Sequence, residues 1–236
     1  MFYDADSAER SDQKFAEQLS RLKQHGTSVL IVGSVRDTHR ESITRLLIGD
    51  DAGEIRHRVL VSTNGSTGDC FHYLNNRSSG LTELITYGAH SRSVSTTSTP
   101  IEPVVDESER VAEDLSDLGI EISSAIERIE MDTEELNPAD LRVCIDSLVP
   151  LLDQYGEERV FTFIHLINGR AITAGGMCQY HLPVERTANV VSVLRPLFDI
   201  VIELRENQGI CQHRWTLVDS EHESGWLPLT AIDLGE

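Results

Sequence analysis

Val29-Leu30-Ile31-Val32-Gly33-Ser34-Val35-Arg36-Asp37-Thr38-His39-Arg40 is the stretch that decides the fold class of this 236-residue chain. Four consecutive apolar residues, mostly β-branched, predict a strand that is buried on both faces. Gly33 interrupts this strand, and apolar residues at helical spacing predict a helix over residues 38–48. A buried strand that turns directly into a helix is typical of an α/β domain with a parallel sheet.

The remainder of the chain continues this alternation. Strands are predicted at residues 58–62, 84–87, 141–146, 177–182, 200–204 and 214–218. Helices are predicted at residues 11–24, 107–129 with a break near Gly119, 149–172 and 188–197, with a short one after Asp69. We therefore expect a mostly parallel central sheet with helices on both faces and an antiparallel pair of closing strands.

The predicted organisation is one domain without an internal repeat. An N-terminal helix occupies residues 1–25, the domain residues 26–230 and a short tail residues 231–236. Within the domain, the Ser/Thr-rich composition of residues 88–105 predicts a flexible loop, which is long for a compact domain.

The charge of the chain is strongly acidic. Twenty Lys and Arg residues stand against 39 Asp and Glu residues, which gives a formal net charge of −19, and only Lys14 and Lys23 are lysines. We expect this composition in a cytoplasmic protein of an extreme halophile, because molar salt shortens the Debye length to about 3 Å and screens the self-repulsion. An ordinary acidic protein is the alternative.

The same charge argues against nucleic-acid and membrane partners. Nucleic-acid binding needs a basic surface, and Arg36, Arg40 and Arg45 form only a local patch beside Asp37 and Glu41. No apolar run approaches the ~18 residues of a membrane span. We expect no nucleic acid and no membrane as partner.

The cysteines and histidines predict no metal site. Cys70, Cys144, Cys178 and Cys211 include no C-x-x-C pair and no zinc spacing, so we expect small buried side chains in a reducing compartment. His165 lies on the apolar side of the predicted helix 149–172, where we expect a buried or boundary residue.

Residues Gly33 to Arg40 occupy the position of a phosphate-binding P-loop, but they lack its key side chains. A P-loop reads Gly, four residues of any type, Gly, Lys and Ser or Thr. Thr38, His39 and Arg40 stand where the second Gly, the Lys and the hydroxyl residue belong. Because the Lys binds the phosphates and the hydroxyl binds Mg²⁺, we expect no cofactor, with ATP and Mg²⁺ as the alternative.

Asp146 and Ser147 end a buried apolar strand, as in the Walker B motif, where the Asp holds magnesium. Many strands of α/β domains also end in an Asp that caps a turn, which is the alternative. Ligands of such sheets bind beyond the carboxyl ends of the strands. A ligand is therefore expected near the loops after Val32, Ser62, Ile145 and Leu182. His181 is a further candidate residue near this edge.

Taken in order along the chain, several stretches resemble the RecA/KaiC-like superfamily of P-loop ATPases, in particular the short haloarchaeal KaiC-like proteins with a degenerate Walker A motif. The similar stretches are residues 29–33, 117–123, 142–148, 160–169, 194–199 and 202–205. The resemblance spans about residues 25–230 and implies a three-layer RecA-like fold that binds ATP between the subunits of a ring. It also implies a catalytic Glu just beyond the second strand, where residues 62–68 contain no acidic residue.

The altered loop and the missing Glu favour a non-catalytic regulatory or protein-interaction module on a RecA/KaiC-like scaffold. We expect no catalytic residue, and vestigial nucleotide-binding residues at Gly33, Thr38, His39, Arg40, Asp146 and Ser147. One alternative is an atypical nucleotide-binding protein or weak ATPase that uses Arg40 and Asp146, with Asp146 as the metal ligand. A second is a transcription or signalling adaptor. We expect a protein partner or self-association through the N-terminal helix and the 88–105 loop.

Overall fold

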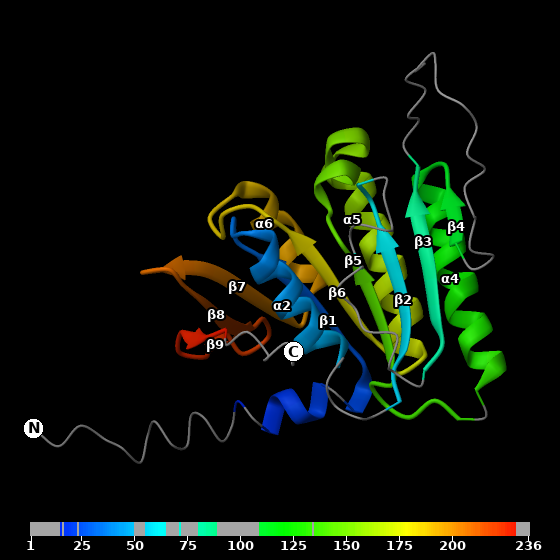
Figure 1. Cartoon of the computed structure of the whole chain (residues 1–236), viewed down its shortest axis with the longest axis horizontal. Helices are drawn as coiled ribbons and strands as arrows, with labels where there is room; N and C mark the ends of the chain where they lie inside the picture. Colours follow the sequence, from blue (N-terminus) through cyan, green and yellow to red (C-terminus); the bar gives the residue numbers. More distant parts are fainter. Residues whose placement is uncertain are drawn as a thin grey trace, which may run out of the picture.

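The computed structural model has an α/β fold built on a ten-stranded, mostly parallel sheet (Figure 1). The structure describes residues 15, 17–22, 24–49, 55–64, 71, 80–88, 109–133 and 135–229. Across the sheet the strand order is β10-β8-β7-β1-β6-β5-β2-β3-β4, and β9 pairs with β8. The strands from β7 to β4 in this order run parallel, and the antiparallel pairs all involve β8.

The elements alternate as the sequence predicts. The strands are β1 (Thr27–Val32), β2 (His57–Ser62), β3 (Thr82–Tyr87), β4 (Glu109–Ala112), β5 (Leu141–Ile145), β6 (Met177–Leu182), β7 (Ile200–Asn207), β8 (Ile210–Leu217), β9 (His222–Glu223) and β10 (Leu227–Pro228). The helices are α2 (Asp37–Ile48), α4 (Leu115–Asp132), α5 (Val149–Thr173), α6 (Asn189–Leu194) and a 3-10 turn at Arg195–Leu197. Residues 17–22, 24 and 25 are also helical.

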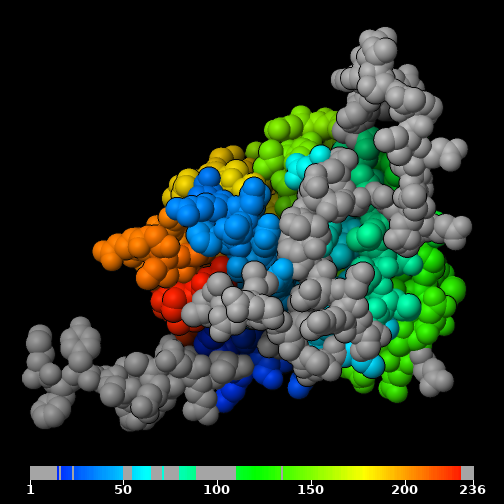
Figure 2. Space-filling view, in the orientation of Figure 1, coloured from blue at the N-terminus to red at the C-terminus, as the bar shows by residue number. Residues whose placement is uncertain are grey.

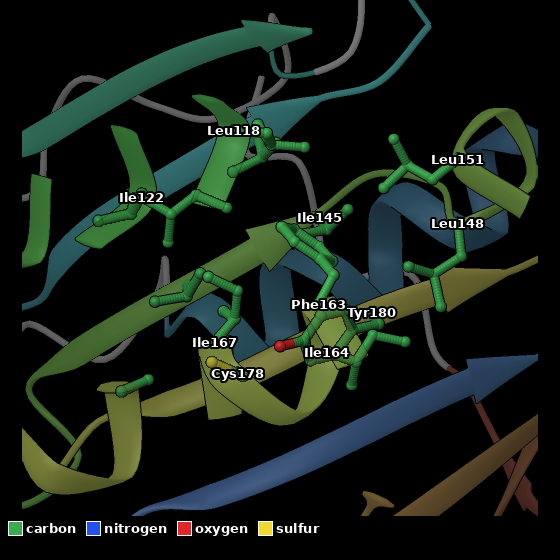
Figure 3. Close-up of a cluster of buried hydrophobic side chains, with 14 of the residues drawn as sticks. Leu118, Ile122, Ile145, Leu148, Leu151, Phe163, Ile164, Ile167, Cys178 and Tyr180 are labelled. Carbon is green, nitrogen blue, oxygen red and sulfur yellow. The ribbon is translucent and has the colours of Figure 1, made fainter. Parts of the chain in front are cut away.

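Helices cover both faces of the sheet. Helix α2 packs on one face, where Ile43 and Leu47 belong to the same buried cluster as Val29 and Ile31 of β1. Helices α4 and α5 pack on the other face, onto a larger cluster that includes Leu30 and is drawn in Figure 3. Because successive side chains of a strand point to opposite faces, the apolar run of β1 serves both clusters, as the sequence predicts.

Strand β1 lies at the point where the chain changes direction across the sheet. After β1 the chain passes through α2 to β2, which lies beyond β6 and β5. After β6 it passes through α6 to β7, on the other side of β1. The loops that follow β1 and β6 therefore diverge, and ligands of open α/β sheets bind at such a position.

The predicted helix over residues 107–129 is wrong in its first part and in its break. Residues 109–112 form the edge strand β4, which pairs in parallel with β3, and α4 then runs without interruption through Gly119. A strand of four residues is too short to have a clear periodicity, so its pairing with β3 outweighs the local pattern. Gly119 stays helical, and the Phe163 ring lies 3.9 Å from where its Cβ would stand.

Other differences from the predicted elements are smaller. Helix α5 contains a non-helical residue at Gly156, with φ 76°. The closing strands are longer than predicted and form the β7–β8 hairpin, whose turn residues Gln208 and Gly209 both have positive φ. His165 is exposed, contrary to expectation. The predicted helix after Asp69 and residues 89–105 of the predicted loop lie outside the described residues.

Candidate functional site

The connection between β1 and α2 is shorter than a P-loop. Four residues, 33–36, join the strand to the helix, and α2 begins at Asp37. Thr38, His39 and Arg40 therefore lie in the first turn of the helix. A P-loop wraps phosphates with the N–H groups of its glycine-rich loop, and a four-residue connection has less backbone with which to do this. In Figure 2, α2 lies on the surface of the face in view.

Gly33 is used for a close approach between strands. Its φ is +123°, and a Cβ atom at this position would lie 2.3 Å from the carbonyl oxygen of Leu204 in β7. The N–H of Gly33 donates to the carbonyl oxygen of Val184, in the loop after β6, at 2.9 Å. Its backbone donor and its missing side chain thus both serve packing within the chain.

The basic side chains that follow Gly33 face carboxylates of this chain. Arg36 forms an ion pair with Glu206 at 2.8 Å, and Arg40 forms an ion pair with Asp37, three residues earlier on α2. Thr38 is exposed, and the buried Nδ1 atom of His39 has no hydrogen-bond partner within the part of the chain that the structure describes. The acidic partners lower the attraction of this patch for phosphate.

Asp146 holds the loop that follows β2 through hydrogen bonds. Its Oδ1 accepts hydrogen bonds from the N–H of Thr63 at 2.8 Å and from the Thr63 hydroxyl at 2.7 Å. Its Oδ2 accepts from the Asn64 amide at 3.2 Å and from the Ser62 hydroxyl at 3.4 Å. Both carboxylate oxygens are thus engaged within the chain. These hydrogen bonds hold the loop after β2 and not the turn that follows β5, so they differ from the capping role that the sequence left as the alternative.

Ser147 is buried and also binds its own surroundings. Its hydroxyl accepts from the N–H of Val149 at the start of α5, at 3.2 Å. Its carbonyl oxygen lies 2.7 Å from the Thr63 hydroxyl, whose single proton is shared between this carbonyl and Asp146. Strand β6 separates β5 from β1. Two strand spacings are about 10 Å, so Asp146 and Ser147 lie in a different part of the edge from Gly33.

His181 is a buried residue that anchors α2. Its Nε2 lies 3.0 Å from the hydroxyl of Thr44 on α2, and the residue is 3% exposed. Burial is the larger cause and the charge of Arg40 the smaller one, and together they lower the pKa of His181 to about 3. The sequence placed His181 near the edge of the sheet where ligands bind, and in the structure its side chain is buried against α2.

Acidification is expected to destabilise the fold through His181. Between pH 6.5 and about pH 3 the unfolded chain binds a proton that the folded chain excludes. Stability therefore falls as pH falls through this window, by up to ~1.4 kcal/mol per pH unit. His181→Gln, which keeps an amide for Thr44, should flatten this slope in urea unfolding, whereas the exposed His165→Gln should not. Equal slopes in the wild type and His181→Gln would contradict the assignment.

The partners of the candidate residues were not predicted. Thr63 and Asn64 lie 83 and 82 residues before Asp146, and Thr44 lies 137 residues before His181. The polar turn after β2 is a weak signal for the first contact, and no periodicity signals the second. Contacts of this kind depend on which strands become neighbours.

Metal and membrane features are absent from the described ranges. No group of three or more His, Cys, Asp or Glu side chains there is arranged to hold a metal ion. None of the helices assigned there is both long and apolar enough to cross a membrane. Cys144, Cys178 and Cys211 are buried, as expected, and burial raises the pKa of Cys178 to about 12. Cys70 lies outside these ranges.

Comparison with protein families yields a match. The model of a family of unknown function, DUF7504, matches residues 26–204. This range includes β1, the connection at residues 33–36, Asp146 and β7 up to Leu204. No curated protein matches the chain.

Proposed function

The chain belongs to the DUF7504 family of unknown function, and we propose that it is a non-catalytic regulatory or protein-interaction module on a three-layer RecA/KaiC-like scaffold. One observation carries this proposal: two of the candidate residues, Gly33 and Asp146, are engaged by contacts within the chain. Gly33 serves the packing against β7, and Asp146 holds the loop after β2. A nucleotide would have to displace these contacts before it could bind.

The arrangement of the sheet supports the scaffold part of the proposal. A central parallel strand leads through Gly33 into a helix, helices lie on both faces, and a second buried strand ends at Asp146. The altered loop lies at the change of direction of the chain, where a ligand of such a sheet would bind. The charge of −19 with two lysines supports the cytoplasm of an extreme halophile as its location.

An atypical nucleotide-binding protein is the second candidate. Arg36, the N-cap residue of α2, makes no side-chain capping hydrogen bond. The N–H groups of a helix's first turn lack partners within the helix and attract anions. Against this candidate, Asp37 puts a carboxylate into the same turn. We do not propose the transcription or signalling adaptor, which would contact DNA through the local Arg patch, because Arg36 and Arg40 both face carboxylates.

Calorimetric titration with ATP and Mg²⁺ in molar KCl tests the proposal. We expect no saturable heat up to about 1 mM nucleotide, which corresponds to a binding free energy weaker than about −4 kcal/mol. Arg40→Ala and Asp146→Asn should give the same isotherm as the wild type. Micromolar binding that either substitution removes would favour the nucleotide-binding alternative and contradict our proposal.

A further inference from the structure

A long groove lies between α4 and α5, on the face of the sheet opposite α2. Its volume is about 1240 Å³. Small residues on α4, Gly119 and Ser123, face Phe163 and Ile167 of α5 across it. The Ser123 hydroxyl donates to the carbonyl oxygen of Gly119, so it presents little unsatisfied polarity. In Figure 1 both helices lie behind the sheet, side by side.

The walls of the groove carry exposed apolar side chains. Ile120 of α4 is 61% exposed and Leu166 of α5 is 64% exposed, and both line the groove. They are among the most exposed large apolar residues in the described ranges. Single exposed apolar residues are ordinary, whereas apolar side chains that lie together on the surface mark binding sites, and these two line one groove with the mostly buried Phe163.

The rim of the groove is acidic. Asp114, Glu127, Glu130 and Glu158 line it, against Arg159 and Arg170. Arg170 forms an ion pair with Glu130. Neither Glu127 nor Glu158 has a side-chain hydrogen bond or ion pair with any residue that the structure describes. A ligand with cationic groups flanking an apolar surface would complement this rim.

The length of the groove fits a helix. The lining residues of α4 extend from Leu115 to Glu130, about 22 Å at 1.5 Å per residue. Pockets for small molecules are usually about 300–1,000 Å³, so the volume exceeds the usual range. An amphipathic helix binds such a groove through apolar residues spaced three and four apart.

We propose that the α4–α5 groove docks an amphipathic helix of a partner protein, whose apolar stripe is flanked by Lys or Arg. The proposal rests on the proposed function as an interaction module and names the surface and the partner's chemistry. The chain's own described N-terminal helical residues are engaged elsewhere, because Phe15, Leu19 and Leu22 pack beside β1 and α2. A second copy has 39 acidic side chains against 20 basic ones, so its surface complements the acidic rim poorly.

Fluorescence anisotropy with synthetic peptides tests the proposal on the full chain, at the lowest salt at which circular dichroism shows the fold. The probe is a peptide of about five helical turns with a Leu stripe flanked by Lys. Its controls are the same peptide with Glu for Lys and a scrambled Lys peptide. The groove variant is Ile120→Glu/Leu166→Glu. Ile210→Glu on β8, where Ile210 is 55% exposed, is the matched protein control.

We expect the Lys peptide to bind with a Kd on the order of 10 µM. The Glu peptide, the scrambled peptide and the groove variant should each weaken binding at least about tenfold, with Ile210→Glu unchanged. The proposal is overturned if the Lys peptide does not bind, if the scrambled peptide binds equally well, or if the groove variant retains its affinity. A change of molecular mass in the groove variant would assign the groove to a second copy instead. The ATP titration is a separate readout, so each proposal can fail alone.

Discussion

Gly33→Ala is expected to lower the free energy of unfolding by about 3 kcal/mol or more. The new Cβ atom would lie 2.3 Å from the carbonyl oxygen of Leu204, a backbone atom that no side-chain rotation can move. The substituted residue would also have to keep a φ of +123°. Strands β1 and β7 must therefore separate, or the loop must change its path and lose the hydrogen bond to Val184.

The control for this prediction is Gly209→Ala, in the β7–β8 turn. Gly209 also has a positive φ, 77°, but a Cβ atom there has no neighbour within 4 Å. The control therefore measures backbone strain alone, which costs about 1 kcal/mol. Thermal unfolding should place Gly33→Ala roughly 6–12 °C below the wild type. If the two variants unfold at the same temperature, the close approach of Leu204 is not the reason that position 33 requires glycine.

Asp146→Ala is expected to cost about 3 kcal/mol of stability. The substitution leaves the N–H of Thr63, a residue that is 3% exposed, without its carboxylate acceptor. It also removes the hydrogen bonds from the Thr63 hydroxyl and the Asn64 amide. Because these bonds join the end of β5 to the loop after β2, the loss should loosen that loop as well as lower stability.

Chemical unfolding of Asp146→Ala, with Asp153→Ala as the control, measures this effect. Asp153 is an exposed residue of α5, where a substitution changes stability by about 0.5 kcal/mol or less. Adding ATP and Mg²⁺ should leave the stability of the wild type unchanged, since a ligand stabilises a fold only when it binds. A magnesium-dependent stabilisation that Asp146→Ala removes would assign Asp146 to a metal instead of to Thr63.

The order of the elements was largely predictable, because it depends on local patterns. Apolar runs such as residues 141–145 and 177–182 predict buried strands, and the structure has strands at both positions. The short strand β4 was missed because its pairing with β3 is an interaction between different segments. The candidate site was predictable only as a set of positions at one edge of the sheet. The contacts of these residues depend on segments far away in the chain: Gly33 meets Leu204, 171 residues later, and His181 meets Thr44, 137 residues earlier.

By itself, the sequence determined the α/β class, the strand that ends at Gly33, the absence of P-loop side chains after Gly33 and the charge of −19. These are properties of residue types and of their local spacing. The tertiary structure alone decided that Gly33 accommodates Leu204, that Asp146 holds Thr63, and that α4 and α5 form a groove. The physical reason is that a hydrogen bond or a steric contact exists only once distant segments become neighbours.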